Sequence, residues 1–582
     1  MMSTTASLTG YFGLRELIFC ALFLATVFYV KYLRRYKDYW KKQNVVHEEF
    51  DLSWAPISNM LKEPIHEIDM NRHRKYGKVF GAFEGLHPTL FLSDPDLIKL
   101  VLVKHFNDLP DRRTVTLNDP ILDNMMTIVC AERWRKIRPA ASPAFTAGKL
   151  RKMNIIIHDC ARITAEHLMG LAEDGKDLNP KEFFGHYTLD VITRCVLGAR
   201  LGSHTAQADE FVAKSQAAFA LKPMPAVVLF CRYSGRHATM HRMTTLCLQF
   251  TSGRCFHSSQ RCYGCASSAL KHSSSLKFLP KCHRVTYFLF FFFNYYLNFS
   301  TRNIPFGAVC IQINKCHLCF PQKHQDFLQL MVDAQDSKMQ VCAEGPQNAE
   351  EKLYNPGAEQ AVERTASAKA LTEEEALSQC VAFFIAGLDA TSSALAFTFY
   401  LLALHPDVQQ KLREEVDRCF EENGEEPSLD DVSKLKYLNC IISESLRMYP
   451  PAVRVERTAC QDVTLGDTGI NLSKGCAVVI PVYAMHHDPE YFPDPEKFDP
   501  ERFSDENIGS IQPYSYLPFG AGPRNCIGMR FALQALRMCL FHVVRSVELL
   551  RTEKTKVPLK MVTTFSLLTA EDITIGVKNR NL

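Results

Sequence analysis

One stretch of the chain lacks acidic residues altogether: positions 211–325 contain no Asp or Glu, although the whole chain of 582 residues has 63. The same stretch holds 14 of the 67 Lys and Arg residues, so the remainder has 67 − 14 = 53 basic against 63 acidic residues, a net charge of −10. The overall net charge of +4 is therefore an average over two unlike sequences. A charge this small does not indicate a nucleic-acid-binding protein, and we expect no such partner.

The sequence also shows no disulfide framework, although it has 21 Cys. A chain of this length that is 47% apolar can bury its own core, which excludes a disordered tail and a small disulfide-held secreted module. Two Cys-x-x-Cys pairs, at 262–265 and 316–319, are separated by 50 residues. That separation is far longer than the loop of a zinc ribbon, so zinc binding is not favoured.

The amino end carries an uncharged run of 14 residues, Leu17 to Val30. As a helix it spans about 21 Å, short of a bilayer core of roughly 30 Å, but extension to 14–33 makes it long enough. Six Lys or Arg follow between Lys31 and Lys42, without a small-residue cleavage site. We therefore predict that residues 1–42 are an uncleaved single-span anchor with a basic flank. A buried core helix or a cleaved signal peptide is the alternative.

Residues 43–582 have the texture of a folded domain. The segments 78–85 and 88–94 predict two short strands around a turn, and apolar residues at helical spacing dominate much of the remainder. Residues 339–369 are rich in Ala, Glu, Gln, Gly and Pro and predict an exposed connecting loop.

The longest predicted helix begins at a capping box formed by Thr372 and Glu375 and ends at Pro406. Its centre is apolar on all faces except for Asp389 and a Thr-Ser-Ser cluster, which predicts a helix buried through the middle of a large domain. A buried Asp is costly unless it is paired or used in chemistry. A structural Asp beside Gly387 is the alternative to a functional one.

The segment PFGAGPRNCIGMRFA, residues 518–532, carries the strongest chemical signal. Its glycines let the backbone turn sharply and approach a flat group closely, and a helix is predicted directly behind its Cys. Amide groups at a helix start stabilise a thiolate, which can ligate a soft metal or haem iron, although a single Cys is more often a small buried hydrophobe. Five positions of the segment form one pattern: Phe519, Gly522, Arg524, Cys526 and Gly528.

At these residues the chain resembles the cytochrome P450 haem-thiolate monooxygenases, whose signature Phe-x-x-Gly-x-Arg-x-Cys-x-Gly is matched at every position. The segments WRKIR, ESLR and PERF follow in the family's order. The resemblance covers about 70–230 and 323–582 and is most like the animal microsomal drug- and xenobiotic-oxidising group. It implies a P450 fold, mainly α with small β-sheets, with an N-terminal transmembrane anchor before the catalytic domain at 43–582.

The resemblance also implies a role for each matched residue. Cys526 is expected to be the axial ligand of the iron in haem b, iron protoporphyrin IX. Glu444 and Arg447 are expected to form a charge pair that locks to Arg502. The haem propionates are expected to be held by Trp134, Arg138, Arg454, Arg457 and Arg524.

The implied reaction inserts one oxygen atom from O2 into a small lipophilic substrate of the xenobiotic, steroid or fatty-acid type. NADPH supplies electrons through a separate NADPH-cytochrome P450 reductase, with cytochrome b5 as a further partner, and no dinucleotide fingerprint is evident in the chain itself. A basic cluster, Arg133, Arg135 and Lys136, is a candidate dock for the reductase, with a solvated helix face as the alternative. The implied location is the endoplasmic reticulum membrane, with the catalytic domain in the cytosol.

One departure from the family concerns the distal motif, Ala-Gly-x-Asp/Glu-Thr, whose last position is Ala390 in this chain. The nearest hydroxyl is on Thr391, about 100° further around a helix. The resemblance implies that Asp389 delivers protons, with Thr391 in place of the missing hydroxyl if the helix is locally unwound. A water or a substrate hydroxyl is the alternative to Thr391. A reductase-independent peroxide isomerase is the alternative.

A second departure lies in residues 231–322, which hold 9 of the 21 Cys and the run YFLFFFFNYYLNF. Such a composition is typical of translated A/T-rich DNA, and Phe320-Pro321-Gln322 can be encoded in the form of a splice acceptor. We predict an atypical insertion, a translated intron, that interrupts the catalytic domain where the family has the helices above the substrate channel. A catalytically impaired haem-binding product is the corresponding alternative function.

Overall fold

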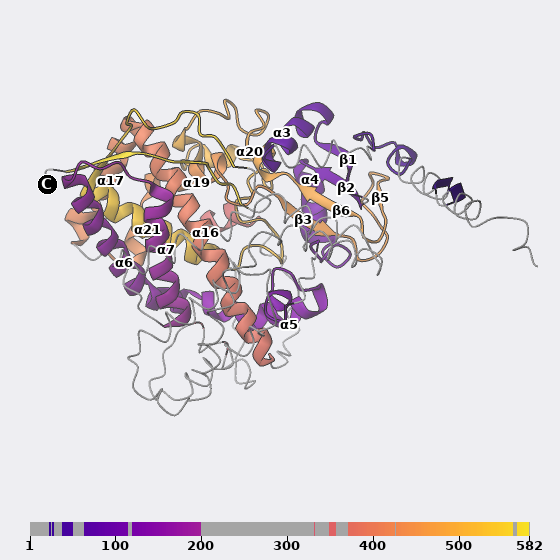
Figure 1. Cartoon of the computed structure of the whole chain (residues 1–582), viewed down its shortest axis with the longest axis horizontal. Helices are drawn as coiled ribbons and strands as arrows, with labels where there is room; N and C mark the ends of the chain where they lie inside the picture. Colours follow the sequence, from indigo (N-terminus) through magenta and orange to yellow (C-terminus); the bar gives the residue numbers. More distant parts are fainter. Residues whose placement is uncertain are drawn as a thin grey trace, which may run out of the picture.

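The computed structural model describes residues 23–24, 26–27, 38–50, 63–85, 87–113, 119–198, 327, 331, 349–356, 371–424, 427–562 and 567–580. The predicted insertion at 231–322 and most of the predicted anchor lie outside these residues. Within the anchor, Phe23, Leu24 and Val27 are helical and 67%, 65% and 46% exposed. In Figure 1 this indigo fragment lies apart from the sheet and the helices.

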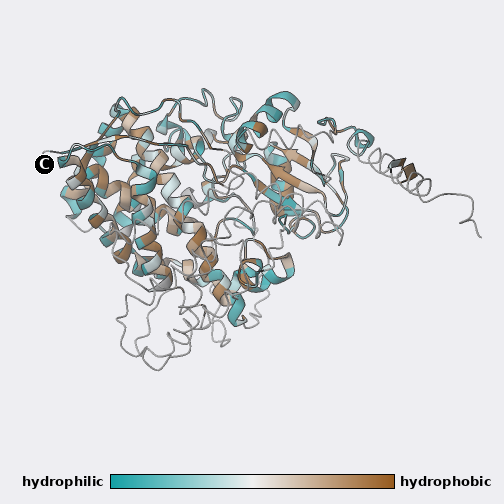
Figure 2. Ribbon diagram, in the orientation of Figure 1, coloured by the Kyte–Doolittle hydropathy of each residue, from teal (hydrophilic) through white to brown (hydrophobic). Residues whose placement is uncertain are grey.

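The largest sheet has four strands in the order β1-β2-β6-β3. The predicted hairpin forms it in part: β1 (Val79–Glu84) pairs antiparallel with β2 (His87–Leu92). The strand β6 (Ala477–Ile480) pairs parallel with β2 and antiparallel with β3 (Val455–Thr458). Figure 2 shows much of this sheet in the brown of apolar residues, as expected for buried strands. The sheet therefore joins the amino-terminal part of the chain to residues far along it.

Two smaller sheets have two antiparallel strands each: β4 (Val463–Thr464) with β5 (Asn471–Leu472), and β7 (Val547–Leu550) with β8 (Gly576–Asn579).

The segment directly after the predicted anchor is fixed to the large sheet. The Trp40 indole is fully buried and its Nε1 donates to the Ala82 carbonyl at 3.0 Å. A Cβ atom at Gly81 would overlap the Trp40 ring, so this close approach requires glycine. Backbone hydrogen bonds join Gly81 to Val46 at 2.8 Å and to Glu48 at 2.9 Å.

The central element is α16 (Glu373–Leu404), which crosses the molecule between the other helices (Figure 1). The predicted capping box is present: the Glu375 amide donates to the Thr372 hydroxyl at 3.1 Å, and the Thr372 amide donates to the Glu375 carboxylate at 3.0 Å. Within the described residues, α16 is the helix long and apolar enough to cross a membrane, but 72% of its apolar window is buried in the protein. It is therefore a core helix, as its all-round apolar sequence predicts.

Eleven further α-helices are described, and several pack around α16, with α7 in the most extensive contact. They are α3 (Ile65–Tyr76), α4 (Pro95–Lys99), α5 (Ala131–Ala141), α6 (Ala147–Glu173), α7 (Pro180–Leu197), α15 (Ala349–Tyr354), α17 (Pro406–Asn423), α18 (Leu429–Ser433), α19 (Lys436–Met448), α20 (Val482–His486) and α21 (Met529–Ser546). The fold is mainly α with small sheets, as predicted.

The prediction of an exposed loop at 339–369 is wrong in one part. Residues 349–354 form α15, and Tyr354 at its end is fully buried, with its hydroxyl 2.7 Å from the Ser443 hydroxyl. The ring also packs edge-on against Phe519, with ring centroids 5.4 Å apart. Tyr354 in the core and Leu353 packed against it dock this polar segment, which composition alone does not show.

Candidate functional site

The loop before α21 holds Cys526 in a tight backbone turn. The Cys526 amide donates to the Phe519 carbonyl at 2.9 Å, which closes the loop on itself. Gly522 has a φ of +73°, and a Cβ at this position would collide with the Leu102 carbonyl oxygen, so only glycine fits. Gly528 differs, because its φ is −88° and a Cβ would meet Phe145 at 3.8 Å, an ordinary contact distance.

The Cys526 thiol lies inside the protein but is not covered by it. Its residue surface is exposed, yet burial among protein atoms raises the pKa of the thiol. An exposed surface and a raised pKa occur together when a side chain faces a space inside the protein and not bulk water. The Gly528 amide and the guanidinium groups of Arg138 and Arg112 act in the opposite direction and favour the thiolate.

Four arginines gather around this loop. The Arg112 Nη2 donates to the Arg524 carbonyl at 3.1 Å, and Arg138 donates to the Asn525 carbonyl at 3.0 Å and to its side-chain oxygen at 2.9 Å. The Arg524 Nη2 donates to the Val129 carbonyl at 3.2 Å. The set is completed by a fourth side chain, Arg457, which donates to the Glu456 carbonyl at 2.8 Å.

This arginine cluster, Arg112, Arg138, Arg457 and Arg524, carries charge that the described residues do not balance. Burial, together with the positive charge of neighbouring arginines, lowers the pKa of Arg138 and Arg524 to about 10 and that of Arg457 well below its usual value. Among the described residues, the one ion pair of the cluster with a carboxylate joins Arg524 to Asp111 at 3.6 Å, and Glu456 acts on Arg112 from a longer distance. The Nε atoms of Arg457 and Arg524 are buried and have no hydrogen-bond partner within the part of the chain that the structure describes. Such a cluster is suited to bind an anion with two carboxylates.

Trp134 on α5 borders the arginine cluster. The Arg524 guanidinium lies over its ring, 4.9 Å from the centroid, and Phe106 packs edge-on at 5.5 Å. Trp134 and Arg138 are four residues apart and share one face of α5. The structure thus brings together four of the five residues predicted to hold propionates.

The fifth, Arg454, lies elsewhere, which corrects the prediction. All three of its guanidinium nitrogens donate to carboxylates, two to Asp69 and one to Glu84 at 2.9 Å. These carboxylates raise the pKa of Arg454. The reason lies in the strand geometry, because side chains three residues apart on an extended chain point to opposite faces. Arg457 in β3 therefore faces the cluster and Arg454 faces away.

Arg112 takes part in the cluster although the sequence reasoning missed it. It forms an adjacent pair with Arg113, which binds Glu84 and Glu456 on the other face. The segment runs beside β3, with a bridge between Asp111 and Thr458. Successive side chains of an extended segment point to opposite faces, which separates Arg112 from Arg113. The Arg-Arg doublet was the one feature of the sequence that could have predicted this arrangement.

Asp389 in the middle of α16 is buried and paired with a cation. The Lys181 ammonium, from the first turn of α7, donates to the Asp389 carboxylate at 2.6 Å and to its carbonyl at 3.0 Å. Lys181 also donates to the Ser392 hydroxyl at 3.1 Å. Burial outweighs the attraction to Asp389 and lowers the pKa of Lys181. The carboxylate is thus committed to the interface with α7.

The helix is not unwound at the distal motif, which removes the condition on which Thr391 was predicted to act. Residues 386–391 are α-helical without interruption. Ala386 is exposed in the middle of a buried helix, and Ala390 lies one turn further on the same face. Thr391 is 7% exposed. A Cβ at Gly387 would approach Ile192 to 2.8 Å, so this glycine lets α7 pack closely and does not open space on the exposed face.

The structure brings Glu444, Arg447 and Arg502 together. Arg447 donates to both oxygens of the Glu444 carboxylate, at 2.7 and 2.9 Å, and both side chains are fully buried. The Arg502 Nε, in the helical turn η8 (Pro500–Phe503), lies 3.4 Å from the same carboxylate. Arg447 also donates to the His486 and Pro495 carbonyls, each at 2.8 Å. The pair therefore ties α19 to the segments that precede the Cys526 loop.

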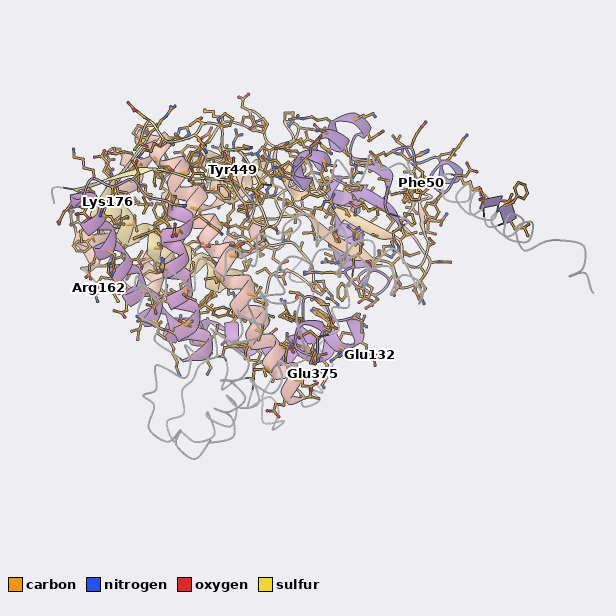
Figure 3. The ribbon with its side chains drawn as sticks, in the orientation of Figure 1. Phe50, Glu132, Arg162, Lys176, Glu375 and Tyr449 are labelled. Atoms are coloured by element: carbon orange, nitrogen blue, oxygen red, sulfur yellow. The ribbon has the colours of Figure 1, made fainter. Side chains whose placement is uncertain are left out.

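The basic cluster on α5 is largely paired within the protein. Lys136 donates to the Glu375 carboxylate at 2.7 Å, and Arg133 lies 3.5 Å from it. Arg135 donates to the Asn107 side chain at 3.1 Å. Figure 3 shows Glu375 at the end of α16 that lies beside α5. Two of the three positive charges therefore join α5 to α16, which weakens their prediction as a dock for another protein.

Comparison with known proteins agrees with this site. The family model described as Cytochrome P450 matches residues 54–247 and 259–575, ranges that include parts of 231–322. Cytochrome P450 3A5 of Homo sapiens is 34% identical over 531 residues, 90% of each chain. Cytochrome P450 3A41 of Mus musculus is 34% identical over 85% of this chain and 83% of its own. The chain therefore belongs to the cytochrome P450 family of haem-thiolate monooxygenases.

Proposed function

We propose that the chain inserts one oxygen atom from O2 into small lipophilic substrates of the xenobiotic, steroid or fatty-acid type. The observation that carries the proposal is the arginine cluster beside Cys526, because among the described residues its four cationic side chains form one ion pair with a carboxylate, Arg524 with Asp111 at 3.6 Å. The two buried Nε atoms without partners, on Arg457 and Arg524, fit haem b and its two propionates.

Each residue of the site has a definite task in this proposal. Cys526 would hold the iron through its sulfur, and the Gly528 amide and the nearby guanidinium groups favour the thiolate form against the burial that raises the pKa of the thiol. The arginine cluster binds and orients the two carboxylates, and Trp134 packs beside it. When bound, haem supplies the iron at which O2 is activated, and a thiolate ligand favours O–O cleavage.

Electron supply is proposed to come from NADPH through a separate NADPH-cytochrome P450 reductase, with cytochrome b5 as a second partner. Arg135 on α5 is an exposed basic side chain available to such a partner, since Arg133 and Lys136 are occupied by Glu375. The named relatives of the 3A group support this electron route.

A single-pass anchor at 1–42 in the endoplasmic reticulum membrane is part of the same proposal. It is supported by the exposed apolar helical residues Phe23, Leu24 and Val27 and by the six basic residues that follow the run. The buried Trp40 would then hold the catalytic domain close behind the membrane on the cytosolic side.

The groups available for proton delivery bear on two candidate functions, a monooxygenase and an enzyme that rearranges peroxides. Asp389 is bound by Lys181, and the family's hydroxyl position is occupied by Ala390. These observations favour, as a second candidate, a reductase-independent enzyme that rearranges peroxides. In the monooxygenase, water or a substrate hydroxyl on the Ala386 and Ala390 face would carry the proton in place of Thr391.

Turnover with defined electron sources distinguishes the two. The full chain in membranes with added reductase is expected to consume NADPH and O2 and to form an oxygenated product. A lipid hydroperoxide without reductase tests the alternative. Peroxide-driven turnover at full rate, with no NADPH-dependent turnover, would contradict the monooxygenase proposal.

The atypical segment 231–322 is proposed to be translated intron, based on its lack of acidic residues and its nine Cys. Without it the chain has 582 − 92 = 490 residues. Long-read sequencing of mature transcripts is expected to show mostly messages that lack it. Its presence in most mature messages would refute the proposal, and with it the alternative of a product impaired by mis-splicing.

A further inference from the structure

The fully buried His486, the last residue of α20, bridges the Glu444–Arg447 pair and the Cys526 loop. Its Nδ1 lies 3.1 Å from the Arg447 carbonyl oxygen, and its Nε2 lies 2.9 Å from the Leu517 amide nitrogen. Arg447 returns the contact, because its Nη1 donates to the His486 carbonyl at 2.8 Å. Two hydrogen bonds of the ring and one of the backbone carbonyl therefore join His486 to Arg447 on one side and to Leu517 on the other.

The partners of the ring fix its tautomer. A backbone amide can only donate, so Nε2 must accept from Leu517, and a carbonyl can only accept, so Nδ1 must carry the proton. The ring is therefore neutral. Burial, and next the positive charge of Arg447, lower the pKa of His486 well below its usual value, in agreement with this assignment.

Leu517 is the point at which the Cys526 loop begins. Its carbonyl accepts from the Gly520 amide at 3.1 Å, which forms the first turn. The Phe519 carbonyl then accepts from the Cys526 amide at 2.9 Å. The residue before the loop, Tyr516, is also held by α19, since its hydroxyl donates to the Ser443 carbonyl at 2.8 Å. A shift of Leu517 would therefore move the whole turn that presents the sulfur.

We propose that His486 is a positioning residue for Cys526, which acts by accepting the Leu517 hydrogen bond and so fixes the loop against α19. The inference rests on the proposed role of Cys526 as the iron ligand. The ring also packs against Tyr516, with centroids 5.2 Å apart, so an aromatic substitution can preserve packing while it removes the acceptor.

The neighbouring His487 offers a matched control. It is also buried and neutral, with a pKa lowered to about 3 by burial, and its Nδ1 bonds to the Tyr483 carbonyl one turn back in the same segment. It has no described hydrogen bond to the Cys526 loop. A general loss of stability would affect His486→Phe and His487→Phe alike, whereas a positioning effect would affect only the first.

The test uses the full-length, haem-loaded chain in membranes and compares four variants. The measurement is the absorption spectrum of the reduced carbon monoxide complex, which distinguishes thiolate from non-thiolate ligation. His486→Phe and His486→Asn both leave Leu517 without an acceptor, and we expect the ratio of non-thiolate to thiolate form to rise about tenfold in each. His486→Gln places an amide oxygen near the Nε2 position and is expected to stay within about twofold of wild type, as is His487→Phe.

Two results would overturn the inference: an unchanged ratio in His486→Asn, or equal losses in the Asn and Gln variants at equal thermal stability. Amide hydrogen exchange gives a readout that does not depend on haem, and Leu517 is expected to exchange faster in His486→Asn than in His486→Gln. Absence of the thiolate spectrum in the wild type would contradict the proposed ligand itself, which is a different outcome from a failure of the His486 variants.

Discussion

At the scale of single residues, Arg457 in β3 and Arg454, directly before that strand, have opposite surroundings although they are three residues apart. Arg454 is fully satisfied by Asp69 and Glu84, whereas Arg457 is buried with an unpartnered Nε and other arginines as neighbours. Removing a charge from each should have opposite consequences for the protein without haem.

We predict that Arg457→Met stabilises the haem-free protein by about 1–3 kcal/mol, because an unbalanced buried charge is removed, and weakens haem binding. Arg454→Met is expected to destabilise the protein by about 3–5 kcal/mol, because Asp69 and Glu84 lose their partner. Denaturant unfolding and haem titration measure the two effects. If Arg457→Met destabilises the haem-free protein as much as Arg454→Met does, the cluster is not an unfilled anion site.

The glycines of the Cys526 loop make a second residue-scale prediction. Gly522→Ala introduces a side chain at φ +73° against the Leu102 carbonyl, and we expect a loss of at least about 2 kcal/mol in unfolding free energy together with reduced haem binding. Gly528→Ala has room for its methyl group, so the expected loss is below about 1 kcal/mol. Thermal unfolding of the two variants compares them directly, and equal losses would contradict the assignment.

At the scale of elements, the sequence predicts the two ends of the helix α16 but not the partner of its buried Asp389. Thr372 and Glu375 form a local capping box, and Pro406 marks the end, so the helix could be placed from the sequence. The partner of Asp389 could not, because Lys181 lies 208 residues earlier in the chain. Long-range pairing of buried charges depends on how α7 packs, and no local pattern records it.

The same limit explains the errors at the arginine cluster. The motifs predicted Arg138, Arg457 and Arg524 as members of the cluster. Residue spacing alone could not show that Arg454 lies outside the cluster and that Arg112 belongs to it. The alternation of side chains along β3 and the segment beside it decides both cases.

An element-scale prediction concerns the exposed face of α16. Ala390→Thr places a hydroxyl on the face of Ala386, and we expect the fraction of NADPH electrons recovered in product to rise by at least about threefold, because a positioned hydroxyl speeds proton transfer. Ala390→Val has the same shape without the hydroxyl and is the control. Equal effects of Thr and Val on this fraction would show that shape, not proton delivery, is responsible.

At the scale of the whole molecule, several histidines with lowered pKa values make stability depend on pH. Burial lowers the pKa of His66 to about 4 and that of His487 and His542 to about 3, from an ordinary value of 6.5. The unfolded chain therefore binds more protons than the folded one below pH 6.5, and stability falls as the pH falls. His486 adds to this trend, because its pKa is also lowered. Asp69 and Glu67 oppose it, because burial raises their pKa values.

We expect His66, His487 and His542 together to decrease the unfolding free energy by about 4 kcal/mol per pH unit once the pH is below the pKa of a free histidine. His542→Phe should reduce the measured slope by about 1.4 kcal/mol per pH unit, the contribution of one such group. Urea unfolding between pH 6 and 5 measures it, and a slope that is flat or of opposite sign would contradict the burial of these rings as neutral groups.

The central claim is that Cys526 is the thiolate ligand of a haem held by the arginine cluster, and the most direct test is the absorption spectrum of the reduced carbon monoxide complex. We predict that the wild-type chain gives the spectrum of a thiolate-ligated haem and that Cys526→Ser loses it, while Cys539→Ser, a buried cysteine on α21, keeps it. A thiolate spectrum that survives in Cys526→Ser would contradict the account.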